Sequence, residues 1–194
     1  TKTNLTGLIT ADIRNPFYSA MFISCEQAAT GYGCNLLLCN SLSDRVKEFE
    51  LLDQLSRQRV DAIIQIGGAV DDLVTDSEYA EKVNLVSERI PFVITGRLDG
   101  TSCTRININE TKAMTLVMEH LCAQEGIRTV AFAGGSTQVK ATVELRACWR
   151  KMMRTLHLEY VADFDEMLAE HIRTGADIKM KCQGCGRIVM LDRM

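Results

Sequence analysis

The sequence predicts an α/β protein made of two similar lobes, each a doubly wound parallel sheet. Short apolar runs without polar alternation recur along the 194-residue chain, as expected of parallel strands that are covered on both faces. Stretches of helical length and periodicity separate these runs. The alternation restarts after a polar, glycine-containing stretch at 98–104. Strands that alternate with helices in this way favour right-handed crossovers within one sheet.

The first lobe, residues 1–100, begins with a buried strand and closes with another. Its strands are expected at 5–11, 35–39, 62–66 and 92–95. Its helices are expected at 17–30, from a cap at Ser41 or Ser43 to 57, and up to 88. Helical spacing places one set of side chains on the inner face of the first helix (Phe17, Met21, Cys25, Ala28) and another on that of the second (Val46, Phe49, Leu52, Leu55).

The second lobe, residues 104–194, repeats the design. A short strand at 105–108 precedes a helix that Asn109 can cap, with Ala113, Val117 and Leu121 on one face. The further elements are expected as a strand at 129–133, a helix at 139–156, a charged helical stretch at 165–172 and a strand at 187–191. We expect this lobe to be incomplete, because residue 194 comes where another helix should begin.

The junction at residues 7–21 is the best candidate for a ligand-facing turn. Asn15 suits the cap of the first helix, and Pro16 suits its first position, where a missing N–H costs nothing. In an open α/β sheet such a junction lies at the carboxyl edge of the strands, where ligands bind. Phe17 and Tyr18 are therefore expected near a crevice. The alternative is that Asn15 is only a cap and Phe17 only a core anchor.

Composition narrows the classes of function. The net charge of -3 and the pI near 5.7 argue against a nucleic-acid footprint on this segment, which usually needs a basic face. No apolar run approaches the roughly 18 to 20 residues needed to span a bilayer, and no signal peptide precedes the first strand, so a cytoplasmic protein is expected. Most of the eight cysteines lie scattered in apolar runs, which favours a reducing compartment. The single CxxC at Cys182 and Cys185 is weak evidence for zinc, and no metal or cofactor is expected.

The sequence gives little support for catalysis. The three histidines, His120, His157 and His171, are dispersed over predicted helices. No GxSxG, Walker or HExxH motif is present, and Gly134-Gly135 is too short for a nucleotide fingerprint. We therefore expect a binding protein rather than an enzyme.

Several stretches in a fixed order carry a resemblance to a known family. They are IxADIRNPFY near the start, GYGCNLLLCNS, QRVDAIIQIGG, PFVITGR, an INxNE helix start, EGIRTVAFAGG and, more faintly, GRIVMLDRM. Together they resemble the ligand-sensing core of the lactose and galactose repressor family of transcription regulators, which has a periplasmic-binding-protein-like type I fold. The resemblance covers almost the whole chain.

The resemblance implies a regulator controlled by a small-molecule effector. The effector would be a sugar, a sugar phosphate or a nucleoside, bound between two lobes whose relative angle it would shift. The family also implies a homodimer, a C-terminal remainder that completes the second lobe, and a helix-turn-helix headpiece ahead of residue 1 that alone would contact DNA. The alternative is an extracytoplasmic sugar-binding protein of a transport system, which would share the fold.

The predicted ligand-binding residues are Phe17, Tyr18, Arg97, Arg146, Asp192, Asp12 and Asn15. Phe17 and Tyr18 offer flat apolar surface, and an arginine fork suits bidentate recognition of hydroxyl groups or heteroatoms. Each polar candidate has an alternative without a ligand: Arg97 as a solvated loop residue, Asp12 as a turn residue bonded to its own backbone, and Arg146 as a charge on the surface of a helix.

The proposed second-lobe ligands rest on the resemblance and depart from the family pattern. The family's arginine comes four residues before an aromatic residue. With Trp149 as that aromatic residue, Leu145 takes this position and Arg146 is its neighbour. Cys148 stands in place of a glycine, and Leu191-Asp192 in place of an Asn-Asp pair, which leaves Asp192 to carry over.

Overall fold

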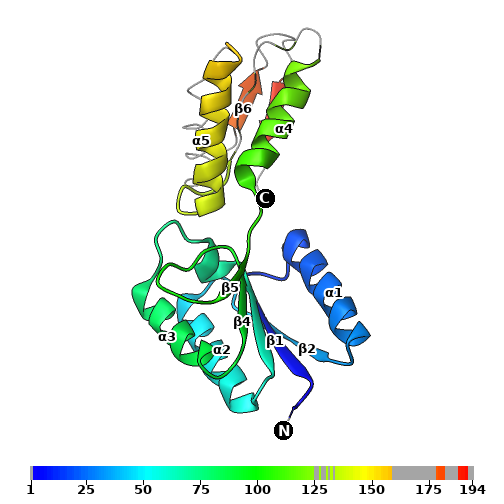
Figure 1. The fold of residues 1–194 in the computed structure, drawn as a ribbon. Coiled ribbons are helices and arrows are strands. Elements are labelled where there is room, and N and C mark those ends of the chain that lie inside the picture. The colour runs from blue at the N-terminus through cyan, green and yellow to red at the C-terminus, as the bar shows by residue number, and fades with distance from the viewer. Residues whose placement is uncertain are drawn as a thin grey trace. The chain divides into compact units, whose positions relative to one another are not determined.

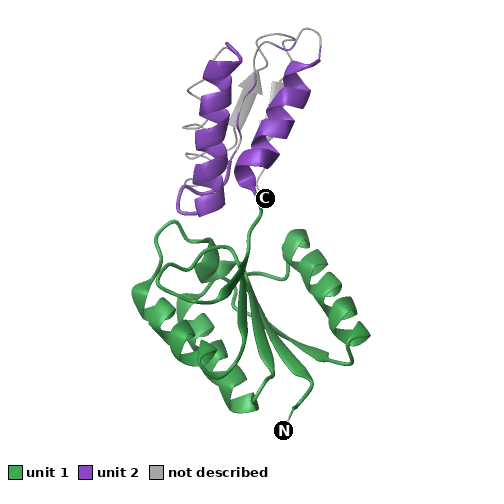
Figure 2. Cartoon of the chain, viewed as in Figure 1, with its two compact units in different colours: residues 1–108 green, residues 109–194 purple. Residues whose placement is uncertain are grey.

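The computed structural model divides the chain into two compact units, residues 1–108 and 109–194 (Figure 2). It describes residues 2–124, 127, 130, 132, 134–158, 178–181 and 188–191.

The first unit is built on a five-stranded parallel sheet, and its first four strands are those that the sequence predicted for the first lobe (Figure 1). The strands are β1 (Leu5–Thr10), β2 (Asn35–Asn40), β3 (Ala62–Ile66), β4 (Phe92–Thr95) and β5 (Thr104–Ile106). Their order across the sheet is β2-β1-β3-β4-β5. We expected the last of these strands to open the second lobe. It instead pairs with β4, with Val93 opposite Thr104, and the first compact unit continues to Ile108.

Helices cover both faces of this sheet, which makes it doubly wound. Helix α1 (Pro16–Gly31) lies on one face, and α2 (Arg45–Gln58) and α3 (Ser77–Ser87) lie on the other (Figure 1). A short 3-10 segment, η1 (Gly68–Asp71), follows β3. The core lies between the sheet and the α2–α3 layer, where Ile9, Leu52, Ile63, Tyr79 and Ile94 are fully buried. Burial of such side chains is the main source of the unit's stability.

Two helical faces differ from the prediction. Helix α2 is capped by Asp44, whose side chain accepts the N–H of Lys47 at 3.1 Å, instead of by Ser41 or Ser43. Its Val46 is 68% exposed, whereas Glu48 is buried beside the leucines of the same helix. Helix α1 has no fully buried residue, and Phe17 is 51% exposed. Phe17 is therefore no core anchor in this chain.

The described part of the second unit contains α4 (Glu110–Cys122), α5 (Lys140–Thr155) and the strands β6 (Ile178–Lys181) and β7 (Ile188–Leu191). A small core holds Met118, Phe132, Trp149 and Met153. The face predicted for α4 was wrong, because Val117 is 54% exposed and Met118 is buried. Strand β7 confirms the strand expected at 187–191.

The strand pairing in this unit differs from the parallel arrangement that the sequence suggested. Strands β6 and β7 pair antiparallel, with Ile178 opposite Leu191. The helical stretch expected at 165–172 and most of the strand expected at 129–133 lie outside the described residues.

Asn15→Ala is expected to lower the free energy of unfolding by about 1 kcal/mol, because the Asn15 side-chain oxygen accepts the N–H of Phe17 at 3.0 Å and caps α1. Urea denaturation measures this loss. Asn15→Ser keeps an acceptor and should remain close to the unchanged protein. Equal losses in both variants would show that the hydrogen-bond acceptor at position 15 is not responsible for the loss.

Candidate functional site

The carboxyl edge of the first unit's sheet brings together the ends of four strands. From β1 the chain crosses to β2 on one side and then returns past β1 to β3 on the other. The gap between β1 and β3 is therefore a topological switch point, the usual ligand position in open α/β sheets. Asp12, Asn15, Phe17, Tyr18 and Arg97 follow β1 or β4 and lie at this edge.

Tyr18 reaches from the start of α1 to the segment that follows β3. Its hydroxyl donates to Asp71 Oδ2 at 3.3 Å, and its ring meets that of Phe17 edge-on, with centroids 5.3 Å apart. Burial, reinforced by the Asp71 carboxylate, raises the pKa of Tyr18 to about 12. Gly67 leaves space for this ring, because a Cβ there would lie 2.6 Å from the Tyr18 hydroxyl. Tyr18 is thus a neutral donor held against η1.

Arg97 meets the same segment from the other side. Its backbone N–H donates to the carbonyl oxygen of Val70 in η1 at 2.8 Å. Its guanidinium pairs with Asp99, and its side chain is 47% exposed. Arg97 and Tyr18 therefore flank one short segment, although they lie far apart in the sequence.

Asp12 and Asn15 both have local structural roles. Asp12 accepts from the guanidinium of Arg14, with its Oδ2 2.7 Å from Arg14 Nη2, and this bond lowers the pKa of the Asp12 carboxyl. Asn15 caps α1 as described above. The turn and cap roles considered as alternatives are thus present, and direct ligand contact by either residue stays a prediction.

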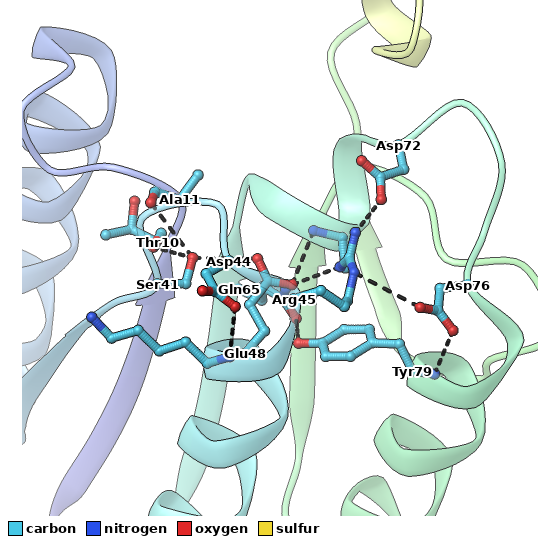
Figure 3. Close-up of polar contacts among 12 residues, drawn as sticks. Thr10, Ala11, Ser41, Asp44, Arg45, Glu48, Gln65, Asp72, Asp76 and Tyr79 are labelled. Atoms are coloured by element: carbon cyan, nitrogen blue, oxygen red, sulfur yellow. Dashed lines mark hydrogen bonds and ion pairs between the residues drawn. The ribbon is translucent and has the colours of Figure 1, made fainter.

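A buried carboxylate lies beneath this edge. Glu48 of α2 is 1% exposed and is held by three groups (Figure 3). Its Oε2 accepts the N–H of Ala69 at 3.2 Å and lies 2.7 Å from Arg45 Nη1, while its Oε1 lies 3.3 Å from Ser41 Oγ. Burial raises the pKa of Glu48, and the charge of Arg45 opposes that rise.

Arg45 links this carboxylate to the loop that joins η1 to α3. Its guanidinium pairs with Asp72 and lies 3.9 Å from Asp76 (Figure 3). It also lies 5.3 Å from the ring centroid of Tyr79, whose hydroxyl donates to Gln65 at 2.8 Å. Burial raises the pKa of Asp72 against the lowering effect of Arg45. The guanidinium thus lies among three carboxylates and offsets part of their charge.

This charged cluster was not predicted from the sequence. A signal was present, because Glu48 shares the helical stripe of Leu52 and Leu55, at spacings of four and three residues. A carboxylate on an inward stripe indicates a buried polar group with partners. Its partner Ala69, and Asp72, which pairs with Arg45, are distant in sequence and gave no local signal.

The two ligands predicted for the second lobe belong to the second unit. Arg146 lies on α5, partly buried, with its guanidinium 5.7 Å from the ring centroid of Phe132. That ring in turn stacks on Trp149 at 5.8 Å. Arg146 is therefore packed on an aromatic pair rather than displayed as a surface charge. Asp192 lies outside the described residues.

A doubly wound parallel sheet with an aromatic pair at its carboxyl edge is typical of the open α/β proteins that bind small ligands. The family model described as periplasmic binding proteins and sugar binding domain of LacI family matches residues 3–177. The chain belongs to this family.

Curated relatives agree with this assignment. Catabolite control protein A of Staphylococcus xylosus is 29% identical over 170 residues, which cover 86% of this chain and 47% of that protein. Catabolite control protein A of Staphylococcus aureus (strain COL) is 32% identical over 142 residues, covering 72% and 40%. The chain thus spans about half the length of the curated relatives it matches. These relatives are regulators rather than enzymes.

Solved structures share the fold. The transcription regulator CcpA of Lactococcus lactis superposes with a TM-score of 0.68 at 22% identity, over 84% of this chain and 58% of that one. A periplasmic binding protein/LacI transcriptional regulator from Alkaliphilus metalliredigens, complexed with D-xylulofuranose, gives 0.64 at 25% identity, over 81% and 55%. The expected periplasmic-binding-protein-like fold is confirmed.

The last residues of the chain match a different family. A model described as bacterial protein of unknown function (DUF951) matches residues 170–194, and the LacI-family match ends at 177. The faint resemblance drawn at GRIVMLDRM lies beyond the LacI-family match and stays a prediction. Asp192, which was carried over from it, lies in the stretch with the other match.

No helix in the described part of the chain is long and apolar enough to cross a membrane.

Proposed function

We propose that this chain is the effector-binding part of a transcription regulator and that its first unit binds a small polyhydroxy ligand at the carboxyl edge of the sheet. The observation that carries the proposal is the Phe17–Tyr18 pair beside η1, at the switch point of a LacI-family unit. The half-exposed Phe17 ring offers a flat surface to the apolar face of a sugar.

The polar groups around that ring suit hydroxyl recognition. Arg97 provides a half-exposed planar fork, and Asp12 provides a carboxylate kept ionised by Arg14. Asn15 and Tyr18 lie on the same turn and helix start. In the second unit Arg146 stays a candidate ligand, and Asp192 stays one on the sequence argument alone.

The names of structural neighbours suggest ligands to try. D-xylulofuranose, fructose 1-phosphate and cellobiose are bound in the structures of three of them. We propose a sugar or sugar phosphate as the effector class, with a nucleoside as the remaining option.

The coupling of effector binding to transcription would follow from a difference in the effector's affinity for two states of the complete regulator. An effector that binds one state of the complete regulator more tightly shifts the population toward that state. We propose that the complete regulator is a cytoplasmic homodimer and that a helix-turn-helix headpiece outside this chain contacts DNA. The regulators among the relatives favour this over a transport-associated binding protein.

Isothermal titration calorimetry of the chain against D-xylulose, cellobiose and fructose 1-phosphate tests the proposal. Saturable binding of at least one compound is expected. Turnover of the bound compound would instead favour an enzyme, and failure to bind these sugars or a nucleoside panel would defeat the proposal.

Phe17→Ala is expected to weaken binding of the best compound by about tenfold or more, because stacking against one aromatic ring contributes on the order of 1.5 kcal/mol. Its effect on stability should be small, since the ring is already 51% exposed. Tyr32→Ala is the matched control, because Tyr32 is 87% exposed at the far end of α1. Equal affinities of the Phe17 variant and the unchanged protein would place the ligand elsewhere.

A further inference from the structure

Tyr18 and Arg97 both form hydrogen bonds with the segment η1. We place these two residues against the effector, on opposite sides of the switch point. Asp71 receives the Tyr18 hydroxyl, and Val70 receives the Arg97 N–H. The positions of Tyr18 and Arg97 therefore depend on where η1 lies. A group that fixes the position of η1 would therefore fix the positions of both residues.

Glu48 is the side chain that anchors η1 from below. It accepts the N–H of Ala69, the central part of η1, at 3.2 Å. Its other oxygen meets Ser41 Oγ, which lies 3.1 Å from the carbonyl oxygen of Thr10. One carboxylate thus connects the ends of β1, β2 and β3 (Figure 3).

The choice of a carboxylate at this position is not explained by packing. Leu52 and Leu55 occupy the same stripe and are fully buried, so an apolar side chain would suit the helix. Burying an ionised group has a desolvation cost, and a well-packed apolar replacement is often neutral or stabilising. What a leucine cannot supply is an acceptor for the Ala69 N–H and a partner for Ser41.

We propose that Glu48 is a positioning residue of the effector site, which fixes η1 through its hydrogen bonds and thereby sets Tyr18 and Arg97. This inference rests on the proposed function for the effector and on the contacts above for the positioning step. Glu48 itself touches no effector.

Two variants of similar volume separate positioning from packing. Glu48→Gln can keep the network, with its oxygen facing Ala69 and Arg45 and its amide nitrogen donating to Ser41, whose hydroxyl then donates to Thr10. Glu48→Leu fills the space and removes all three hydrogen bonds, to Ala69, Ser41 and Arg45. Glu50, exposed on the same helix, provides the controls Glu50→Gln and Glu50→Leu.

The experiment measures amide hydrogen exchange at Ala69 and Arg97 by NMR in the full chain, and the Kd of the best-binding compound among D-xylulose, cellobiose and fructose 1-phosphate. Glu48→Leu is expected to remain folded, to exchange both amides at least tenfold faster and to raise the Kd at least tenfold. Glu48→Gln should stay within about threefold of the unchanged protein, and both Glu50 variants should match it.

Each contrary result has a distinct meaning. Unchanged exchange at Arg97 or an unchanged Kd in Glu48→Leu would overturn the inference, because packing alone would then suffice. A Glu48→Gln variant as impaired as Glu48→Leu would also overturn it, since charge rather than hydrogen bonding would be responsible. If the unchanged protein binds none of the compounds, the proposed function fails, and the exchange rates alone decide whether Glu48 fixes η1.

Discussion

Gly68→Ala should lower the free energy of unfolding by about 3 kcal/mol, through backbone strain combined with overpacking. Gly68 has φ of 70°, a conformation that costs an L side chain energy, and an added Cβ would lie 1.9 Å from Glu48 Oε1. The carboxylate has no easy escape, because moving it breaks its bonds to Ala69, Ser41 and Arg45.

Gly33→Ala is a matched control for the strain alone. Gly33 has the same φ of 70°, and nothing lies within 4 Å of an added Cβ. We expect it to cost about 1 kcal/mol. Urea denaturation of both variants gives the comparison, and equal losses would mean that the Glu48 carboxylate moves aside freely. Adding Glu48→Ala to Gly68→Ala should remove the part of the loss that comes from the steric clash and leave the part that comes from backbone strain.

The sheet of the first unit was predictable because its strands have local signals. β3 and β4 are short apolar runs bounded by glycine or proline, and the structure places them at the predicted residues. Pro16 marked the start of α1 because its ring suits only the first turn. These features depend on neighbours in the sequence, which a single sequence displays.

Features set by distant contacts were missed. Thr104–Ile106 has no apolar stretch that assigns it to either unit, and only its pairing with β4 places it in the first. Val46 was expected inside because it is apolar, but the stripe of α2 is set by the layer it covers, which takes Glu48 instead. A residue's type does not reveal which partner neutralises it.

The candidate site also combines features with a local sequence signal and features set by distant contacts. Tyr18 was placed at the carboxyl edge by its position after β1, and the structure places it there. Its contact with Asp71, 53 residues away, is a property of the folded sheet. Likewise, Arg97 was predicted as a ligand from its place after β4. The hydrogen bond from its backbone N–H to Val70 of η1 is a property of the folded sheet.

Arg45→Met should lower the free energy of unfolding at neutral pH by about 3 kcal/mol, because removing one partner leaves a buried carboxylate without its counter-ion. Glu48 is 1% exposed and Arg45 is the cation beside it, at 2.7 Å. The loss should depend on pH. Without Arg45 the folded-state pKa of Glu48 rises further above its unfolded value, so the folded state binds a proton more strongly than the unfolded state.

Protonation of Glu48 therefore favours folding in this variant, and the loss should shrink as the pH falls from 7 through the raised folded-state pKa. Urea denaturation at pH 7 and pH 5 measures this change. Arg57→Met, exposed in the last turn of the same helix, should show neither the loss nor its pH dependence. Adding Glu48→Gln to Arg45→Met removes the uncompensated charge, so it should recover much of the stability at pH 7. A double variant as unstable as Arg45→Met alone would mean that Arg45 acts through Asp72 and Asp76 rather than through the buried carboxylate.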